Sequence, residues 1–125
     1  MTEFEKMRSS QLYNFSDPVG ETDTHLFDLG AVGEDVSIQP MFWCDYGFNI
    51  HTHGLTIVNY NCVMLDGGRI TIGDNVLIGP NCQIYTPQHP MDYVPRRGTI
   101  ETAYPVTIGE DTWLCGSVIV CPGVT

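Results

Sequence analysis

The sequence predicts an all-β fold, a single-stranded left-handed parallel β-helix of about four coils. The prediction depends on a six-residue period: Ile72, Ile78 and Ile84 follow one another at this spacing, and the first two precede glycine. The same phase returns in residues 108–125, after a stretch that has no period. Six residues fit neither the turn of an α-helix, about 3.6 residues, nor the simple alternation of a hairpin strand. Each repeat is therefore expected to form one short strand and one corner of a triangular solenoid.

Three repeats make one coil, so residues about eighteen apart are expected to stack at the interstrand spacing of about 4.8 Å. The repeats are expected to begin at Val32, and residues 32–125 without their aperiodic stretch give roughly four coils, above the minimum of about three. The period weakens between residues 42 and 68, where Thr52 and His53 occupy the place of an aliphatic residue and a glycine.

The length of 125 residues is enough for one hydrophobic core. We expect an N-terminal helical segment and connector in residues 1–28, and the β-helix in residues 29–125 with an external loop at about 86–105. The loop is rich in proline and has no period, and loops of this length tend to be functional. Within residues 1–17, four apolar side chains indicate a short helix. They are Phe4, Met7, Leu12 and Tyr13.

The charge balance limits the partners of the protein. Fifteen acidic and five basic side chains give a net charge of −10, which repels nucleic acid and anionic lipid surfaces. No run of eighteen apolar residues is present, so we expect no membrane partner and a cytoplasmic location.

The five cysteines form no CxxC pair, so the sequence predicts neither a disulfide framework nor a structural zinc site. Cys62 and Cys82 fall at the fifth place of their repeats, where a small inward side chain is expected. Reduced thiols, mostly buried, are therefore predicted.

His89 is the first candidate for chemistry, because it lies where the regular repeats give way to the loop. Pro87 and Pro90 flank it and restrict its direction. An imidazole with an ordinary pKa of about 6.5 can take a proton from a hydroxyl group at neutral pH. The alternative is a solvated loop histidine without a catalytic role.

Five segments resemble the maltose and galactoside O-acetyltransferases in order and in spacing. They are residues 42–50, 59–66, 72–76, 84–90 and 105–113. The start of the chain also resembles the N-terminal helical segment of that family, in a shortened form. Compared with the family, the chain is expected to be truncated at its C-terminus, before the later coils that carry most of the coenzyme contacts.

The resemblance implies a homotrimer with active sites between subunits, which transfers acetyl from acetyl-CoA to a sugar hydroxyl and needs no metal. The acceptor would be of the maltose, glucose or galactoside type. His89 matches the catalytic base of the family, which activates the hydroxyl for direct attack on the thioester. Among the expected substrate-binding residues, Asp45 and Asn59 match family positions that contact the sugar. Asp66 lies beside another such position, and Glu101 corresponds to a further position on the acceptor side. The matching coenzyme-binding positions are Trp113 and Gly116.

Alternatives remain open for individual residues and for the whole chain. Asp45 and Asp66 could be corner residues, because aspartate tolerates turn geometry, and Asn59 and Asn61 could stack in an inward ladder. The protein could also be a catalytically degenerate trimeric scaffold or sugar-binding remnant, since five basic side chains offer little charge to coenzyme phosphates.

Two other chemistries are weaker alternatives. A γ-type carbonic anhydrase shares the fold and binds zinc through three histidines. His51 or His53 could pair with His89, but Val94 stands where that family has another histidine. Cys115 could act as an acyl-carrying nucleophile, but no base is placed beside it in the sequence.

Overall fold

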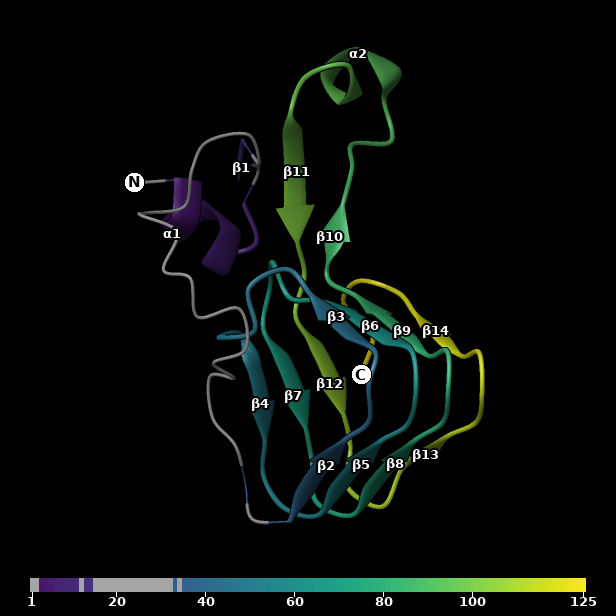
Figure 1. Ribbon diagram of the computed structural model, residues 1–125. Coiled ribbons are helices and arrows are strands. Elements are labelled where there is room, and N and C mark those ends of the chain that lie inside the picture. Colours follow the sequence, from purple (N-terminus) through teal and green to yellow (C-terminus); the bar gives the residue numbers. More distant parts are fainter. Residues whose placement is uncertain (1–2, 12, 15–32, 34) are drawn as a thin grey trace.

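The computed structural model describes residues 3–11, 13–14, 33 and 35–125, and within them it confirms the left-handed parallel β-helix (Figure 1). Three parallel sheets form the sides of the solenoid. The first side contains β4 (Ile50–Thr52), β7 (Ile70–Ile72) and β12 (Val106–Ile108). The second contains β2 (Val36–Ile38), β5 (Thr56–Val58), β8 (Val76–Ile78) and β13 (Trp113–Leu114). The third contains β3 (Phe42–Cys44), β6 (Cys62–Leu65), β9 (Gln83–Tyr85) and β14 (Ile119–Val120).

The first coils are longer than predicted. Ile50 pairs with Ile70, twenty residues later, and Val36 pairs with Thr56 at the same spacing. The expectation of eighteen residues is therefore wrong for these coils. The two extra residues of each coil lie between the third and first sides, where β3 leads into β4 and β6 leads into β7. We call this the wide corner. It comprises residues 45–49 and 66–69 and, in the next coil, the place where residues 86–105 leave the solenoid and return to it.

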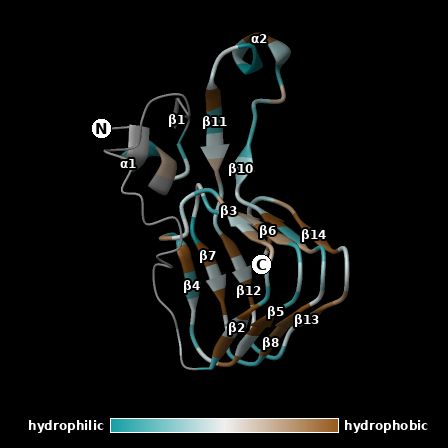
Figure 2. Cartoon of the chain, viewed as in Figure 1, coloured by the Kyte–Doolittle hydropathy of each residue, from teal (hydrophilic) through white to brown (hydrophobic). Residues whose placement is uncertain are grey.

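The interior is filled by alternate residues of each strand. In β5, β7 and β8 the first and third side chains are buried and the middle one points outward. Figure 2 shows hydrophobic residues along the strands of all three sides. Cys62 and Cys82 are buried among them, as predicted. The prediction of mostly buried thiols is wrong for the other three, because Cys44 is half-buried and Cys115 and Cys121 are exposed. Because full burial of an aliphatic side chain contributes roughly 1.5–3 kcal/mol, this continuous core stabilises the stack of coils.

Left-handed backbone conformations turn the other corners. Asn61, Asn75 and Asn81 have φ angles of 64°, 56° and 60°. Asparagine is among the few residues other than glycine that adopt this region readily. Asn61 Nδ2 donates to Asn81 Oδ1 at 2.9 Å on the exposed surface of the corner. The Asn61 ladder is thus real but faces outward, and the prediction of an inward ladder is wrong for this residue.

The external loop forms an arm that leaves the solenoid at the wide corner (Figure 1). Its strands β10 (Pro87–Gln88) and β11 (Ile100–Ala103) are antiparallel, and α2 (Tyr93–Arg96) lies between them in the chain. The N-terminal strand β1 (Tyr13–Asn14) pairs with the other edge of β11. A three-stranded sheet therefore stands beside the wide corner and positions the residues at its base.

The N-terminal helix α1 covers Glu3–Arg8, a shorter span than the predicted helical segment, and β1 was not predicted. Met7 of α1 is buried against Ala103, with Tyr46 packed beside them. Residues 15–28 of the predicted N-terminal segment and connector, and the first repeat residue, Val32, lie outside the described residues. The division into residues 1–28 and 29–125 stays a prediction. Among the described helices, none is long and apolar enough to cross a membrane.

Candidate active site

An open pocket of about 650 Å³ lies where the arm meets the wide corner. Four parts of the chain form it: the turn after β3, the outward residues of β6 and β9, the base of the arm, and the corner after β14. The lining residues are Asp45, Tyr46, Val63, Leu65, Tyr85, Pro87, His89, Glu101 and Pro122. Three of the predicted site residues, His89, Asp45 and Glu101, thus come together in one cavity.

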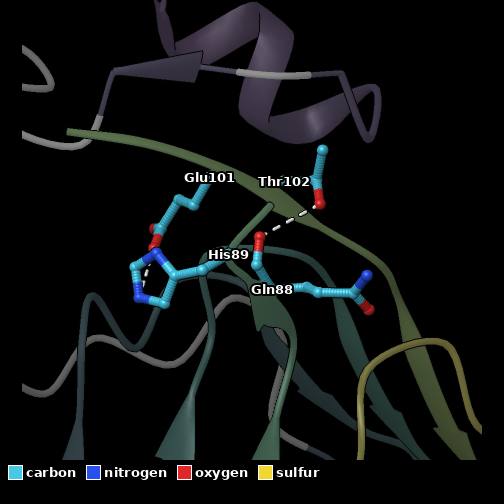
Figure 3. Close-up of polar contacts among 4 residues, drawn as sticks. All are labelled: Gln88, His89, Glu101 and Thr102. Atoms are coloured by element: carbon cyan, nitrogen blue, oxygen red, sulfur yellow. Dashed lines mark hydrogen bonds and ion pairs between the residues drawn. The ribbon is translucent and has the colours of Figure 1, made fainter. Parts of the chain in front are cut away.

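His89 and Glu101 face each other across the base of the arm (Figure 3). Gln88 pairs with Thr102 in the antiparallel hairpin, so the next residue on each strand, His89 and Glu101, is brought to the same end. Thr102 Oγ1 donates to the main-chain oxygen of Gln88 at 3.2 Å, which fixes this register. The distance from His89 Nε2 to Glu101 Oε2 is 3.9 Å, close enough for an ion pair when the imidazole is protonated.

The two side chains differ in exposure. The His89 side chain is 55% exposed and open to an incoming substrate, whereas that of Glu101 is only 14% exposed. A partly buried carboxylate beside an imidazole can form an ion pair with the ring once the ring has abstracted a proton. The pair therefore has the arrangement of a general base with a charged neighbour.

Asp45 contributes a second polar group to the pocket. Partial burial, followed by the charges of Asp66 and Glu101, raises the pKa of Asp45 to about 6. A carboxyl group with this pKa can accept a hydrogen bond when ionised and donate one when protonated. Near neutral pH it can therefore bind a sugar hydroxyl in either role.

The raised pKa predicts a pH-dependent effect of Asp45→Asn on stability. The pKa of the folded state lies above the ordinary 3.8, so ionisation of Asp45 opposes folding. The favourable contribution of the neutral acid is complete below pH 3.8 and is lost as the pH rises through about 6. We expect Asp45→Asn to raise the free energy of unfolding at pH 8 by about 1 kcal/mol, after allowance for solvent screening. Thermal denaturation at pH 4 and pH 8 measures the difference.

Asp74→Asn is the matched control, because Asp74 is an exposed corner carboxyl outside this pocket. Its effect gives the baseline for neutralising one negative charge on a protein of net charge −10. A gain from Asp45→Asn that is the same at both pH values, or no larger than that of Asp74→Asn, contradicts the prediction.

Asp66 is fully buried and lies beneath the turn that carries Asp45. Its Oδ1 accepts from the main-chain N–H of Tyr46 at 2.9 Å, and its Oδ2 accepts from Gly47 at 2.8 Å and Asn49 at 3.1 Å. These contacts favour the corner role over direct sugar binding. The substrate-binding role of Asp66 stays a prediction.

The remaining predicted site residues lie away from this pocket. Asn59 is half-buried at the corner between the second and third sides, where its Oδ1 accepts from the N–H of Tyr60 at 2.7 Å. Gly116 lies at the same corner, two coils along, and Trp113 is 70% exposed on β13 beside it. We call this the Gly79 corner, which comprises residues 59–61, 79–81 and 115–117. The binding roles of Asn59, Trp113 and Gly116 stay predictions.

Several pocket residues were missed by the sequence analysis. Val63 and Leu65 alternate with buried residues of β6, and Tyr85 holds the equivalent outward place on β9. The hexapeptide pattern identifies inward residues, so outward ones escape it. The alternation within each strand, combined with nearness to the wide corner, could have found them. Tyr46 and Pro122 carried no such signal.

The described part of the chain contains no set of ligands that would support the zinc-enzyme alternative. No group of three or more His, Cys, Asp or Glu side chains there has an arrangement that could hold a metal ion. His51 and His53 lie on and after β4, outside the pocket that contains His89.

Comparison with known proteins identifies the family. No model of a known protein family matches the chain. Nodulation protein L of Rhizobium meliloti (strain 1021) is 39% identical, and the match covers 99% of this chain and 81% of that protein. The chain belongs to the hexapeptide-repeat sugar O-acetyltransferase family.

Solved structures agree with this assignment. The crystal structure of a maltose O-acetyltransferase from Clostridium difficile 630 has a TM-score of 0.86 at 36% identity, and the match covers 98% of this chain and 79% of that one. A hexapeptide-repeat acetyltransferase from Vibrio cholerae O1 biovar eltor, complexed with acetyl coenzyme A, has a TM-score of 0.78 at 34% identity, with 98% and 79% covered. The resemblance to the sugar O-acetyltransferases and the fold predicted from the sequence are both confirmed.

Proposed function

We propose that this member of the acetyl-CoA-dependent sugar O-acetyltransferase family transfers acetyl to a sugar hydroxyl, with His89 as the general base. The observation that carries the proposal is the meeting of His89, Glu101 and Asp45 in one open pocket. The acceptor is a sugar of the maltose, glucose or galactoside type.

The chemistry needs one base and no covalent intermediate on the protein. The His89 imidazole removes the proton of the acceptor hydroxyl as its oxygen attacks the thioester carbonyl carbon. The carbon–sulfur bond then breaks, and the imidazolium returns the proton to the departing thiolate of coenzyme A. Glu101 stabilises the imidazolium during the time between these two transfers, because its carboxylate lies 3.9 Å away.

The pocket suits a small polyhydroxylated ligand. Asp45 and Glu101 offer carboxyl oxygens to hydroxyl groups, and the rings of Tyr46 and Tyr85 offer apolar faces with polar tips. A few polar groups within a partly apolar lining are typical of sites that orient a small molecule. Such orientation directs one hydroxyl toward His89, which is a large part of the catalytic effect.

A homotrimer would complete the site. Asn59, Trp113 and Gly116 lie at or beside the Gly79 corner, away from His89, so a single chain does not join them to the pocket. The second side also presents an apolar stripe in register, in which Ile57 pairs with Leu77 and Leu77 with Trp113. If this stripe packs against a neighbouring chain, the Gly79 corner of one chain can supply the coenzyme contacts for the His89 pocket of the other. Light scattering is expected to give the mass of three chains, and a monomeric mass contradicts the proposal.

The test of the activity is a thiol-release assay with acetyl-CoA and a panel of maltose, glucose and galactosides. We expect at least one sugar to raise coenzyme A release above the rate without acceptor, and mass spectrometry to show one added acetyl group on that sugar. Release at the same background rate with every acceptor supports the scaffold alternative instead. Calorimetric titration with coenzyme A tests separately whether the chain binds the donor.

A further inference from the structure

The turn that carries Asp45 into the pocket needs outside support. The wide corner adds two residues to each of the first coils, and the residues of the turn lie between β3 and β4 rather than in either strand. Buried main-chain N–H groups need an acceptor, because leaving one without a partner costs about 1–3 kcal/mol. For the N–H groups of Tyr46, Gly47 and Asn49 the acceptor is one side chain of the next coil, Asp66.

Asp66 and Asn49 bind each other's segments reciprocally. The Asp66 carboxylate accepts from three N–H groups of the turn, and Asn49 Nδ2 donates back to the main-chain oxygens of Asp66 at 2.7 Å and Gly67 at 3.3 Å. Asp66 and Asn49 are 0% and 5% exposed. Neither lines the pocket, whereas Asp45 and Tyr46 at the start of the turn do.

We propose that Asp66 and Asn49 are positioning residues, which hold the turn of residues 45–49 so that Asp45 and Tyr46 present their side chains to the acceptor sugar. The inference rests on the proposed function, because it concerns the acceptor pocket of that reaction. It gives Asp66 a role through the turn rather than by contact with the sugar.

The charge of Asp66 also acts on Asp45. Titratable groups face Asp45 from every element around it: Cys44 and Tyr46 on its own segment, Asp66 from the next coil, Tyr85 from β9, and Glu101 and His89 from the arm. Besides burial, Asp66 is the largest cause that raises the pKa of Asp45. Removal of its charge therefore lowers the pKa of Asp45, and any exposure of Asp45 that follows loosening of the turn lowers it further.

We call the hydrogen bonds that join Asp66 and Asn49 across the turn the clamp. Two variants separate its parts. Asp66→Asn replaces an acceptor of three N–H groups by an amide that cannot accept all of them, and it removes the charge. Asn49→Ala removes only the two hydrogen bonds donated by the side chain and keeps the charge. We expect the KM for the sugar that the wild type acetylates to rise about tenfold in Asp66→Asn and about threefold in Asn49→Ala. The KM for acetyl-CoA is expected to change less than about twofold, because the donor contacts lie at another corner.

Thr52→Val is the matched control. Thr52 is buried, and its Oγ1 accepts from the N–H of Gly33 at 3.0 Å, at a corner that contributes nothing to the pocket. The Thr52→Val variant loses a comparable hydrogen bond between a side chain and the main chain. It is therefore expected to have a lower melting temperature but an unchanged KM for the acceptor sugar. Carboxyl NMR of Asp45 is the second measurement: its pKa is expected to fall in both variants, and to fall further in Asp66→Asn, which also loses the charge of Asp66.

The proposal is overturned if the acceptor KM of both variants stays within about twofold of wild type while their stability falls as in Thr52→Val. If Asp66→Asn does not fold, Asn49→Ala decides by the same criterion. If wild type acetylates no sugar, the proposed function fails, and the clamp is judged by the Asp45 titration: an Asp45 pKa that keeps its wild-type value in both folded variants overturns it.

Discussion

His89→Ala is expected to lower the kcat of sugar acetylation by about 10²- to 10⁴-fold, the usual contribution of a positioned general base. The KM values for sugar and acetyl-CoA are expected to change much less, because Asp45, Tyr46 and the donor contacts remain. The loss is expected to shrink at high pH, where solvent hydroxide can take the place of the missing imidazole. Steady-state rates from the thiol-release assay between pH 6 and pH 9 measure both effects.

His53→Ala is the control for His89→Ala. His53 is also an exposed histidine, but it lies after β4 in a different depression, beside Asp35 and Asp74. Its replacement is expected to leave kcat within about twofold of wild type. Equal rates for His89→Ala and wild type, with a sugar that wild type acetylates, exclude the base role and leave His89 as a solvated loop histidine.

The solenoid was predicted correctly because each six-residue repeat contains an apolar residue whose side chain points into the interior. Ile70, Ile72 and Val76 fill the interior as the period requires. The length of the first coils was predicted wrongly, because the two extra residues at the wide corner belong to no strand and leave no periodic signal. Thr52 shows the effect: it pairs with Ile72, twenty residues later, although a strict six-residue count does not connect them.

The pocket was predicted in part for a related reason. His89 was singled out by its place where the repeats give way to the loop, whereas Asp45 and Glu101 were found only through resemblance to a family. The arm depends on pairing between distant segments, since Tyr13 of β1 lies opposite Glu101 of β11. Such long-range pairing has no signature within a window of a few residues. The same holds for Asp66, whose carboxylate reaches back by about one coil to residues 46–49.

Gly79→Ala is expected to destabilise the fold by about 1–3 kcal/mol, because the Gly79 corner leaves no room for a methyl group. A Cβ atom at Gly79 would lie 2.7 Å from the main-chain N of Gly116 and 2.8 Å from the carbonyl carbon of Cys115. Both atoms belong to the backbone of the next coil, so the clash cannot be relieved by a rotamer change. Relief requires the two coils to separate, which also lengthens the hydrogen bond from Gly79 N to Leu114 O, now 2.8 Å.

Gly109→Ala provides the comparison, since Gly109 also follows the last residue of a strand. A Cβ atom there would meet only Thr112 Oγ1, at 3.9 Å, among the described residues. The effect is expected to stay within about 0.5 kcal/mol, and loss of unfolded-chain entropy can even make it stabilising. Urea denaturation of both variants at equal protein concentration measures the contrast free of any mass-action effect of association. Both glycines hold the same place in their repeats, but only Gly79 is in tight contact with the next coil. An equal fall in the free energy of unfolding for the two variants would therefore mean that the repeat itself, and not contact between coils, requires glycine.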